Sequence, residues 1–295
     1  TSLAFGQYLI DEGWTLPEIS SALGITITSV NDIVPPQPDF SDELDLRPIW
    51  LAWQNFKQQY PAIYFETIFS AVRAVDPSRP LHQYAGMGAG DLSYYLPVFQ
   101  SYDVELAFGA GGSTVAPSLQ SIALQFGVPM QAEPSGVPPT HPDIAVTTFY
   151  KLAHGISSGD INIMWGRYFD SGNSETISGV EAATELLDSL PDVESLPVNC
   201  DIAIGLGMRS IINQSRSFMW IDWVNFNTYG YGSVLTSVIA GNANAGFVTE
   251  HFPQDLLDAW PAIVWLEAPL LANEDAERIA DHIANGGKAI LMGET

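Results

Sequence analysis

Several residue types that common functions require are scarce in this sequence. Its 295 residues include a single cysteine, Cys200, so no internal disulfide can form, and no Cys/His cluster indicates a structural zinc site. Lysine and arginine together number 10, against 34 aspartates and glutamates, which gives a formal net charge of −24. Because a protein that binds the phosphate backbone needs a basic face, this composition excludes a general nucleic-acid binder.

Long apolar runs are also missing. No stretch of about eighteen consecutive apolar residues occurs, which excludes a membrane-spanning helix. The first residues, TSLAFGQYLIDEG, contain no basic segment before an apolar one, so no signal peptide is visible. The last residues, GGKAILMGET, form a strand pattern, and we expect a fragment of a longer protein. Since salt screens the repulsion between like charges, the acidic composition favours a saline-adapted organism over an ordinary acidic secreted protein.

The apolar residues alternate between strand and helix patterns after residue 80. An alternation of this kind predicts parallel strands joined by right-handed crossovers. We therefore expect an α/β fold, either half of an eight-stranded barrel or an open sheet. The strand patterns occupy 80–88, 102–112, 128–133 and 161–169, and the helical patterns occupy 117–127 and 143–159.

Helical patterns precede this alternation. The segment TLPEISSALGI (15–25) spaces its apolar residues as a helix does, and Thr15 is its expected N-cap. The longest helical pattern covers 45–75, and we expect Pro61 to kink or split that helix. The sequence DPSRP then ends it.

A second alternation follows the proline-bearing linker at 187–199. It resembles a flavodoxin-like or amidotransferase-like layer, in which helices cover both faces of a parallel sheet. The segment GLGMRS after its first strand lacks the glycine spacing of a dinucleotide fingerprint, so we expect no nucleotide cofactor. The expected strands are 200–207, 245–252, 262–271 and 288–294, and the expected helices are 231–242 and 273–287.

The stretch VPMQAEPSG (128–136) raises the main functional question. Val128, Met130 and Ala132 alternate as on a strand, and Glu133 then meets a Pro-Ser-Gly turn. One interpretation is a surface turn in an acidic protein. The other is a catalytic glutamate at the carboxyl end of a barrel strand, the rim at which barrel enzymes place their catalytic residues.

The order of these pieces resembles the β-galactosidases of glycoside hydrolase family 42. The segment VPMQAEPSG looks like the seventh barrel strand, and FYKLAHGISSGDINIMWGRYFDSGNSE looks like the following helix and eighth strand. The segment AIVWLEAPLLANEDAERIADHIANGGKAIL is similar to the flavodoxin-like domain through which that family forms trimers. The resemblance implies the second half of a (β/α)8 barrel at 1–190 and a flavodoxin-like domain at 191–295.

The resemblance also assigns roles to single residues. Glu133 matches the nucleophile of a retaining mechanism, in which a carboxylate attacks the anomeric carbon and forms a glycosyl-enzyme. Its acid/base partner lies in an Asn-Glu pair that the family places before the region matched here, so we expect this chain alone to be inactive. Glu175 matches a glutamate that hydrogen-bonds a sugar hydroxyl. Trp165 and Tyr168 offer aromatic faces to a sugar ring, and His141 is a further candidate for contact with substrate.

Some positions depart from the family pattern and keep other functions open. Ser178 stands where the family has a histidine, and Thr140 with His141 replaces a tryptophan. These departures leave two alternatives to a β-galactosidase: a non-catalytic carbohydrate-binding or assembly module, and an agarase-like hydrolase of another galactan. The resemblance otherwise implies a carbohydrate substrate, no cofactor or metal, a cytoplasmic location and a homotrimer.

Overall fold

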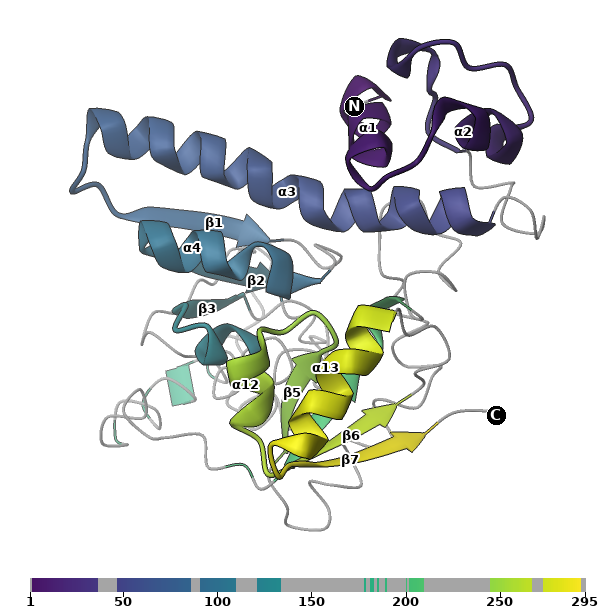
Figure 1. Ribbon diagram of the computed structural model, residues 1–295. Coiled ribbons are helices and arrows are strands. Elements are labelled where there is room, and N and C mark those ends of the chain that lie inside the picture. Colours follow the sequence, from purple (N-terminus) through teal and green to yellow (C-terminus); the bar gives the residue numbers. More distant parts are fainter. Residues whose placement is uncertain are drawn as a thin grey trace.

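The computed structural model describes residues 2–36, 47–85, 91–109, 121–133, 202–209, 245–266 and 273–292, with six isolated positions between 178 and 200. This part of the chain contains two parallel sheets with short helices beside them, a long helix and an N-terminal pair of short helices (Figure 1). The predicted α/β class with parallel strands is therefore confirmed. The predicted helices at 143–159 and 231–242 and the strand at 161–169 lie outside the described residues.

The N-terminal segment folds as a small helical cluster. It contains α1 (Ser2–Asp11), α2 (Leu16–Leu23) and the 3₁₀ turn η1 (Val30–Asp32). Thr15 caps α2 as predicted: its hydroxyl accepts the Glu18 N–H at 3.4 Å, and the Glu18 carboxylate accepts the Thr15 N–H at 2.8 Å. The sequence pattern did not predict α1. The buried side chains of this cluster are Phe5, Leu9, Ile19, Ile27, Ile33, Ile49, Trp50, Trp53 and Phe56.

The long helix α3 (Arg47–Val75) connects this cluster to the first sheet. It runs through Pro61 as one helix of 29 residues, so of the two predicted outcomes the split is wrong, and the kink stays a prediction. Proline removes one backbone donor and crowds the preceding turn. Packing on both sides offsets that cost, because Trp53 lies in the N-terminal cluster while Phe69 lies in the core around the sheets.

The first sheet contains β1 (Leu81–Ala85), β2 (Val104–Gly109) and β3 (Met130–Glu133), all parallel and in that order. Between β1 and β2 the chain forms the 3₁₀ turn η4 (Leu92–Tyr94) and the helix α4 (Leu96–Tyr102). A helical segment at 121–125 precedes β3, and Gly127 ends it with a positive φ of 65°. The predicted parallel pairing is confirmed, and β3 is described as far as Glu133.

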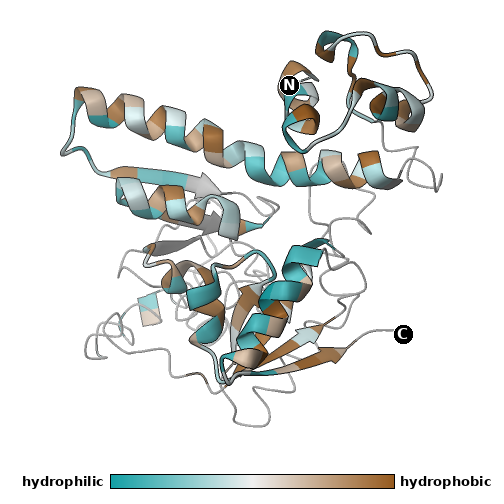
Figure 2. Cartoon of the chain, in the orientation of Figure 1, coloured by the Kyte–Doolittle hydropathy of each residue, from teal (hydrophilic) through white to brown (hydrophobic). Residues whose placement is uncertain are grey.

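The second sheet contains β4 (Ile202–Leu206), β5 (Ala245–Thr249), β6 (Ala262–Leu266) and β7 (Lys288–Met292), again all parallel. Their spatial order is β5-β4-β6-β7. Helix α12 (Gln254–Asp258) precedes β6, and α13 (Asn273–Ala284) precedes β7. The strands are mostly apolar, whereas α13 carries polar residues along much of its length (Figure 2). Strands β4 and β5 are almost fully buried, while β7 is mostly exposed.

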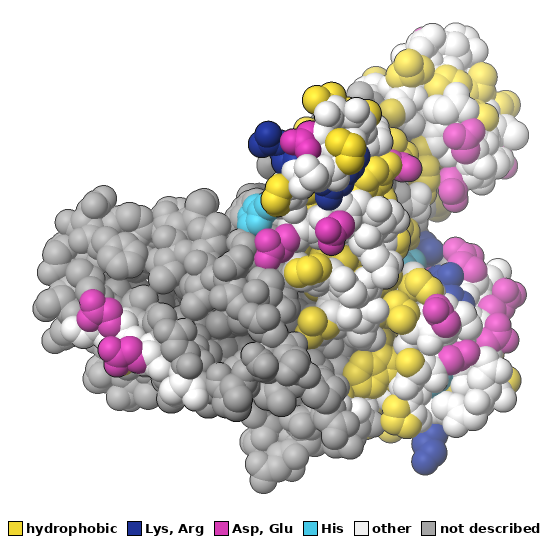
Figure 3. All heavy atoms as spheres, turned by 90° about the vertical axis from the view of Figure 1, so that its left-hand side faces the viewer, with side chains coloured by type: hydrophobic (Ala, Val, Ile, Leu, Met, Phe, Trp, Pro, Cys, Tyr) yellow, Lys and Arg dark blue, Asp and Glu magenta, His cyan; other side chains and the backbone are white. Residues whose placement is uncertain are grey.

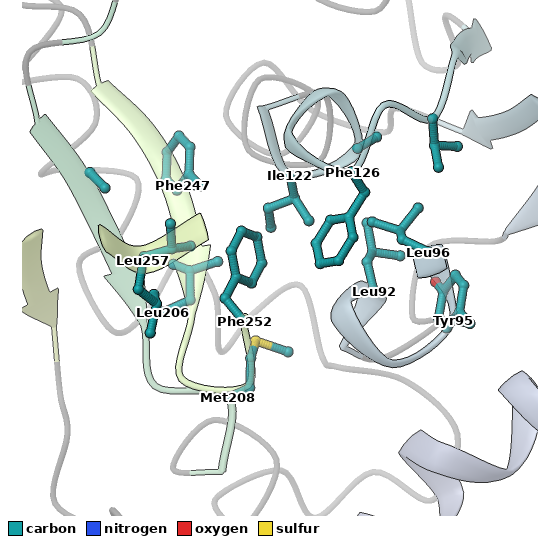
Figure 4. Close-up of a cluster of buried hydrophobic side chains, with 14 of the residues drawn as sticks. Leu92, Tyr95, Leu96, Ile122, Phe126, Leu206, Met208, Phe247, Phe252 and Leu257 are labelled. Atoms are coloured by element: carbon teal, nitrogen blue, oxygen red, sulfur yellow. The ribbon is translucent and has the colours of Figure 1, made fainter. Parts of the chain in front are cut away.

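The two sheets share one apolar core. Leu92, Leu96 and Phe126 come from the segments around the first sheet, and they face Phe247 and Phe252 from the second (Figure 4). The rings of Phe126 and Phe252 meet edge to face at 5.0 Å between centroids. The two parts therefore pack against each other through buried side chains.

The described surface reflects the acidic composition. Asp and Glu side chains are spread over the described part of the face in Figure 3, and Lys and Arg are fewer there. Among the described helices, none combines the length and the apolar character needed to cross a membrane.

Candidate active site at the carboxyl ends of the parallel strands

Glu133 is the last residue of β3. Its neighbour across the ladder is Gly109, the last residue of β2, and β1 ends at Ala85, which pairs with Phe108. Because the strands are parallel, these ends lie at the same edge of the sheet. Catalytic residues of barrel enzymes occupy this edge. The described backbone carries β3 as far as Glu133, in parallel register with β2, and a catalytic role of Glu133 stays a prediction.

The strand register also tells which face of the sheet Glu133 occupies. Leu106 aligns with Met130 and is buried in the core that includes Phe69 and Phe99 of helices α3 and α4. Residues that alternate along a strand belong to opposite faces. Glu133 therefore lies on the face opposite to the one that packs against these helices.

Other polar residues occupy that second face. His82 and Glu105 are aligned on β1 and β2, and the His82 Nδ1 atom lies 3.8 Å from the Glu105 Oε2 atom. Gln131 and Glu133 continue the same alternation on β3. A sheet with helices on one face and polar residues on the other resembles the inward face of a barrel near its mouth.

Glu175, Trp165, Tyr168 and His141 lie outside the described residues. Their roles as substrate contacts remain predictions. In the described part of the chain, no group of three or more His, Cys, Asp and Glu residues is arranged to hold a metal ion.

A second polar cluster lies where the two sheets meet, and its centre is the pair Asp91 and His251. Asp91 precedes η4 and is fully buried at its side chain, while the His251 side chain is 6% exposed. The His251 Nδ1 atom lies 2.5 Å from Asp91 Oδ2, and Asp91 Oδ1 accepts the Ser93 N–H at 3.0 Å and its hydroxyl at 2.7 Å. The Tyr94 ring packs on the imidazole at 4.8 Å between centroids.

The electrostatics of this pair follow from its burial and its partners. Burial alone would raise the pKa of the Asp91 carboxyl, but the hydrogen bond and charge of His251, with the bonds from Ser93, outweigh burial and lower it. Burial alone would likewise lower the pKa of His251, and the bond to Asp91 and the charges of Asp91 and Glu250 outweigh burial and raise it. Both shifts favour the ion pair.

The carboxyl ends of β4 and β5 are closed by internal contacts. The Glu250 carboxylate accepts the backbone N–H groups of Met208 at 2.8 Å and Arg209 at 2.6 Å. The Arg209 Nε atom donates to Asp275 at 2.7 Å, and Arg278 donates to the other oxygen of Asp275 at 2.5 Å. Ligands of open parallel α/β sheets bind at this edge. Here the chain's own carboxylates and arginines occupy this edge and bond to one another, so these contacts stabilise the second sheet.

Sequence reasoning missed this second cluster although a signal was present. Glu250 and His251 directly follow the apolar strand β5, and Arg209 follows β4 by three residues. This is the same signal that identified Glu133: a charged side chain after an apolar strand. Asp91 carries no such signal, because its partner is 160 residues away.

Comparison with known proteins gives a fold but no sequence relative. No protein-family model matches the chain, and no curated protein matches it. Solved structures of glycoside hydrolase family 42 β-galactosidases do match. A catalytic mutant of such an enzyme from G. stearothermophilus superposes with a TM-score of 0.70 at 14% identity, over 98% of this chain and 48% of that one.

Two further β-galactosidase structures agree. The cold-adapted enzyme from Rahnella sp. R3 gives a TM-score of 0.68 at 14% identity, over 97% of this chain and 47% of its own. The enzyme from Bacillus circulans sp. alkalophilus gives a TM-score of 0.67 at 12% identity, and the match covers 97% of this chain and 48% of that enzyme. The chain shares its fold with these β-galactosidases. It spans about half the length of each of them.

The likeness to these structures concerns the fold alone. At identities of 12–14% it carries no residue assignment by itself. The roles of single side chains must come from their positions in this chain, and Glu133 at the strand end is the position with the strongest argument.

Proposed function

We propose that this chain is part of a retaining glycoside hydrolase that acts on β-galactosides or related galactans, with Glu133 as the nucleophile. The observation that carries the proposal is the run of β3 as far as Glu133, on the sheet face opposite to the one that packs against the described helices α3 and α4. In such an enzyme the Glu133 carboxylate attacks the anomeric carbon, and water then hydrolyses the glycosyl-enzyme.

The acid/base residue of this mechanism would come from barrel strands that precede the chain. It would sit about 5–5.5 Å from the Glu133 carboxylate in a retaining enzyme. Two features of the described residues support such a neighbour. Strand β1 pairs only with β2 among the described strands, and α3 exposes Ile63, Tyr64 and Val75 at 61%, 56% and 87%. In a complete barrel, a preceding strand and helix cover these positions.

Two domains follow from the same proposal, a partial barrel at 1–190 and a flavodoxin-like domain at 191–295. In chain order, the second sheet has the arrangement 2-1-3-4, with which flavodoxin-like sheets begin. That order supports the assignment. The proposal includes a homotrimer through this domain and sugar contacts from Glu175, Trp165, Tyr168 and His141.

The test is hydrolysis of an aryl β-galactoside by the complete protein with Glu133→Gln. Glutamine keeps the size of the side chain and removes the attacking charge, so kcat should fall by about three or more orders of magnitude. The thermal unfolding midpoint should stay unchanged. Glu133→Ala should be rescued by azide, which fits the vacated space and yields a glycosyl azide of inverted configuration.

The matched control is Glu105→Gln. Glu105 lies on the same face of the neighbouring strand, four residues before its carboxyl end. The control should retain turnover within about twofold, since barrel chemistry occurs at the carboxyl ends of the strands. Near-normal turnover of the Glu133→Gln protein would refute the assignment.

A further inference from the structure

Side-chain hydrogen bonds connect the second sheet to the segments around the first sheet. We call this set of bonds the junction. Strand β5 is the edge of its sheet in the described part of the chain, and its outer edge is bonded by side chains from the segment at 121–125. The Phe247 N–H donates to Ser121 Oγ at 2.9 Å, and the Phe247 carbonyl accepts the Gln125 amide at 2.7 Å. Gln125 in turn accepts the Trp260 indole N–H at 2.8 Å.

The same strand makes two contacts to Asp91 at its carboxyl end. The Thr249 hydroxyl lies 3.3 Å from Asp91 Oδ1, and His251 Nδ1 lies 2.5 Å from Asp91 Oδ2. Most junction contacts use donors that do not titrate near neutral pH. These are the contacts of Ser121, Gln125, Trp260 and Thr249. Only the Asp91–His251 contact joins two side chains that titrate below pH 8.

We propose that the Asp91–His251 pair is a protonation-dependent lock that holds β5, and with it the second sheet, against the η4 segment that follows β1. Its strength depends on the charge of the imidazole. Asp91 accepts hydrogen bonds from Ser93, so the proton in the contact belongs to His251 Nδ1. The proton that leaves as pH rises is therefore the one on Nε2, which is buried and has no partner among the described residues.

The charged groups around the imidazole come from each element that packs on it. Asp91 and Tyr94 come from the η4 segment, Glu250 from the end of β5 and Arg209 from the segment after β4. The two carboxylates favour the charged imidazole and Arg209 opposes it, so the surroundings favour protonation overall. When His251 loses its charge, the Nδ1–H bond remains and the attraction to Asp91 weakens.

The sign of the pH dependence of this contact follows from the pKa shifts of His251 and Asp91, the two groups that form it. The folded pKa of His251 is raised, so its contribution is fully present below the unfolded value of about 6.5 and is lost as pH rises toward the folded value. The folded pKa of Asp91 is lowered, so its contribution is present above about 4 and is lost as pH falls through the folded value. The lock is strongest between these limits.

Amide hydrogen exchange of the complete protein tests the lock. The opening constant of the β5 amides, corrected for the intrinsic exchange rate, should rise by up to about tenfold per pH unit above about pH 6.5, because one proton is linked to opening. His251→Gln should retain a donor to Asp91 and lose this slope. A wild-type profile without a slope would overturn the proposal, and so would a slope that survives in His251→Gln.

Two control variants separate the lock from general effects. Gln125→Ala removes uncharged bonds of the same junction, so it should raise the opening constant by one factor at every pH. His282→Gln changes another buried histidine, on helix α13. The His282 side chain is 1% exposed, and its Nδ1 atom lies 3.5 Å from Asp258 Oδ1. The pH slope of β5 should persist in both controls. Loss of the slope in His282→Gln would assign it to that histidine and refute the lock.

The lock does not rest on the proposed hydrolase activity. Its readout is the exchange of backbone amides, which needs no substrate. A protein that fails the Glu133 test can therefore still pass this one.

Discussion

Replacement of Gly205 by alanine should strongly destabilise the second sheet. Gly205 lies on β4 directly beside Trp265 of β6, and a Cβ atom at this position would fall 2.3 Å from Trp265 Cε3 and 2.4 Å from Cδ2. Carbon atoms that are not bonded have their optimal separation at about 3.5–4.0 Å. The ring or the strand must therefore move by about 1 Å or more. Trp265 is 1% exposed, so it has no free space to enter.

The expected magnitude follows from overpacking of a tight core. Overpacking typically costs about 1–3 kcal/mol, and a clash with an aromatic ring on the adjacent strand belongs at the upper end. At about 3 kcal/mol, the unfolding midpoint should fall by about 6–12 °C, if each kcal/mol shifts it by about 2–4 °C in a chain of this size. Circular dichroism melts and the calorimetric transition measure the change.

A double-mutant cycle checks the cause of that change. Trp265→Leu removes the ring atoms that the new methyl group would meet, so Gly205→Ala should cost at least about 1 kcal/mol less in that background. Equal costs in the two backgrounds would show that the ring is not the obstacle. An unchanged midpoint for Gly205→Ala alone would refute the packing argument altogether.

Two other predictions concern local stability. Thr15→Ala removes the capping box of α2, which should cost about 1 kcal/mol and raise the exchange of the α2 amides about fivefold, whereas an unchanged rate would contradict the role of the cap. Phe252→Ala opens the core shared by the two sheets, and chemical denaturation should show a loss of about 3–5 kcal/mol. Phe252→Leu should cost much less, and equal losses for both variants would argue against packing as the cause.

Parallel pairing was predictable because its signals are local. A helical pattern at 117–127 separates the strand patterns at 102–112 and 128–133, and a helix between two strands indicates a crossover connection. The carboxylate at the end of β3 was predictable for the same reason: Glu133 is followed by Pro134, which cannot extend a central strand.

Local signals misled where packing decided the outcome. Pro61 predicts a break in α3, yet the helix continues because its two halves pack in different apolar clusters. The helix α1 was missed because its pattern is weak, and Phe5 and Leu9 are fully buried in a cluster that also contains Ile33 and Trp53. Helix stability in proteins comes mostly from such packing.

The amino-acid sequence by itself determined the strand-helix alternation, the parallel pairing and the place where the Glu133 strand stops. These features depend on residue spacing and turn residues within a few positions of one another. Only the tertiary structure decided that the two sheets share one core, that Gly205 faces a tryptophan and that Asp91 pairs with His251 across 160 residues. Contacts of this kind depend on which surfaces meet, and no local pattern encodes the distance between residues that are far apart along the chain.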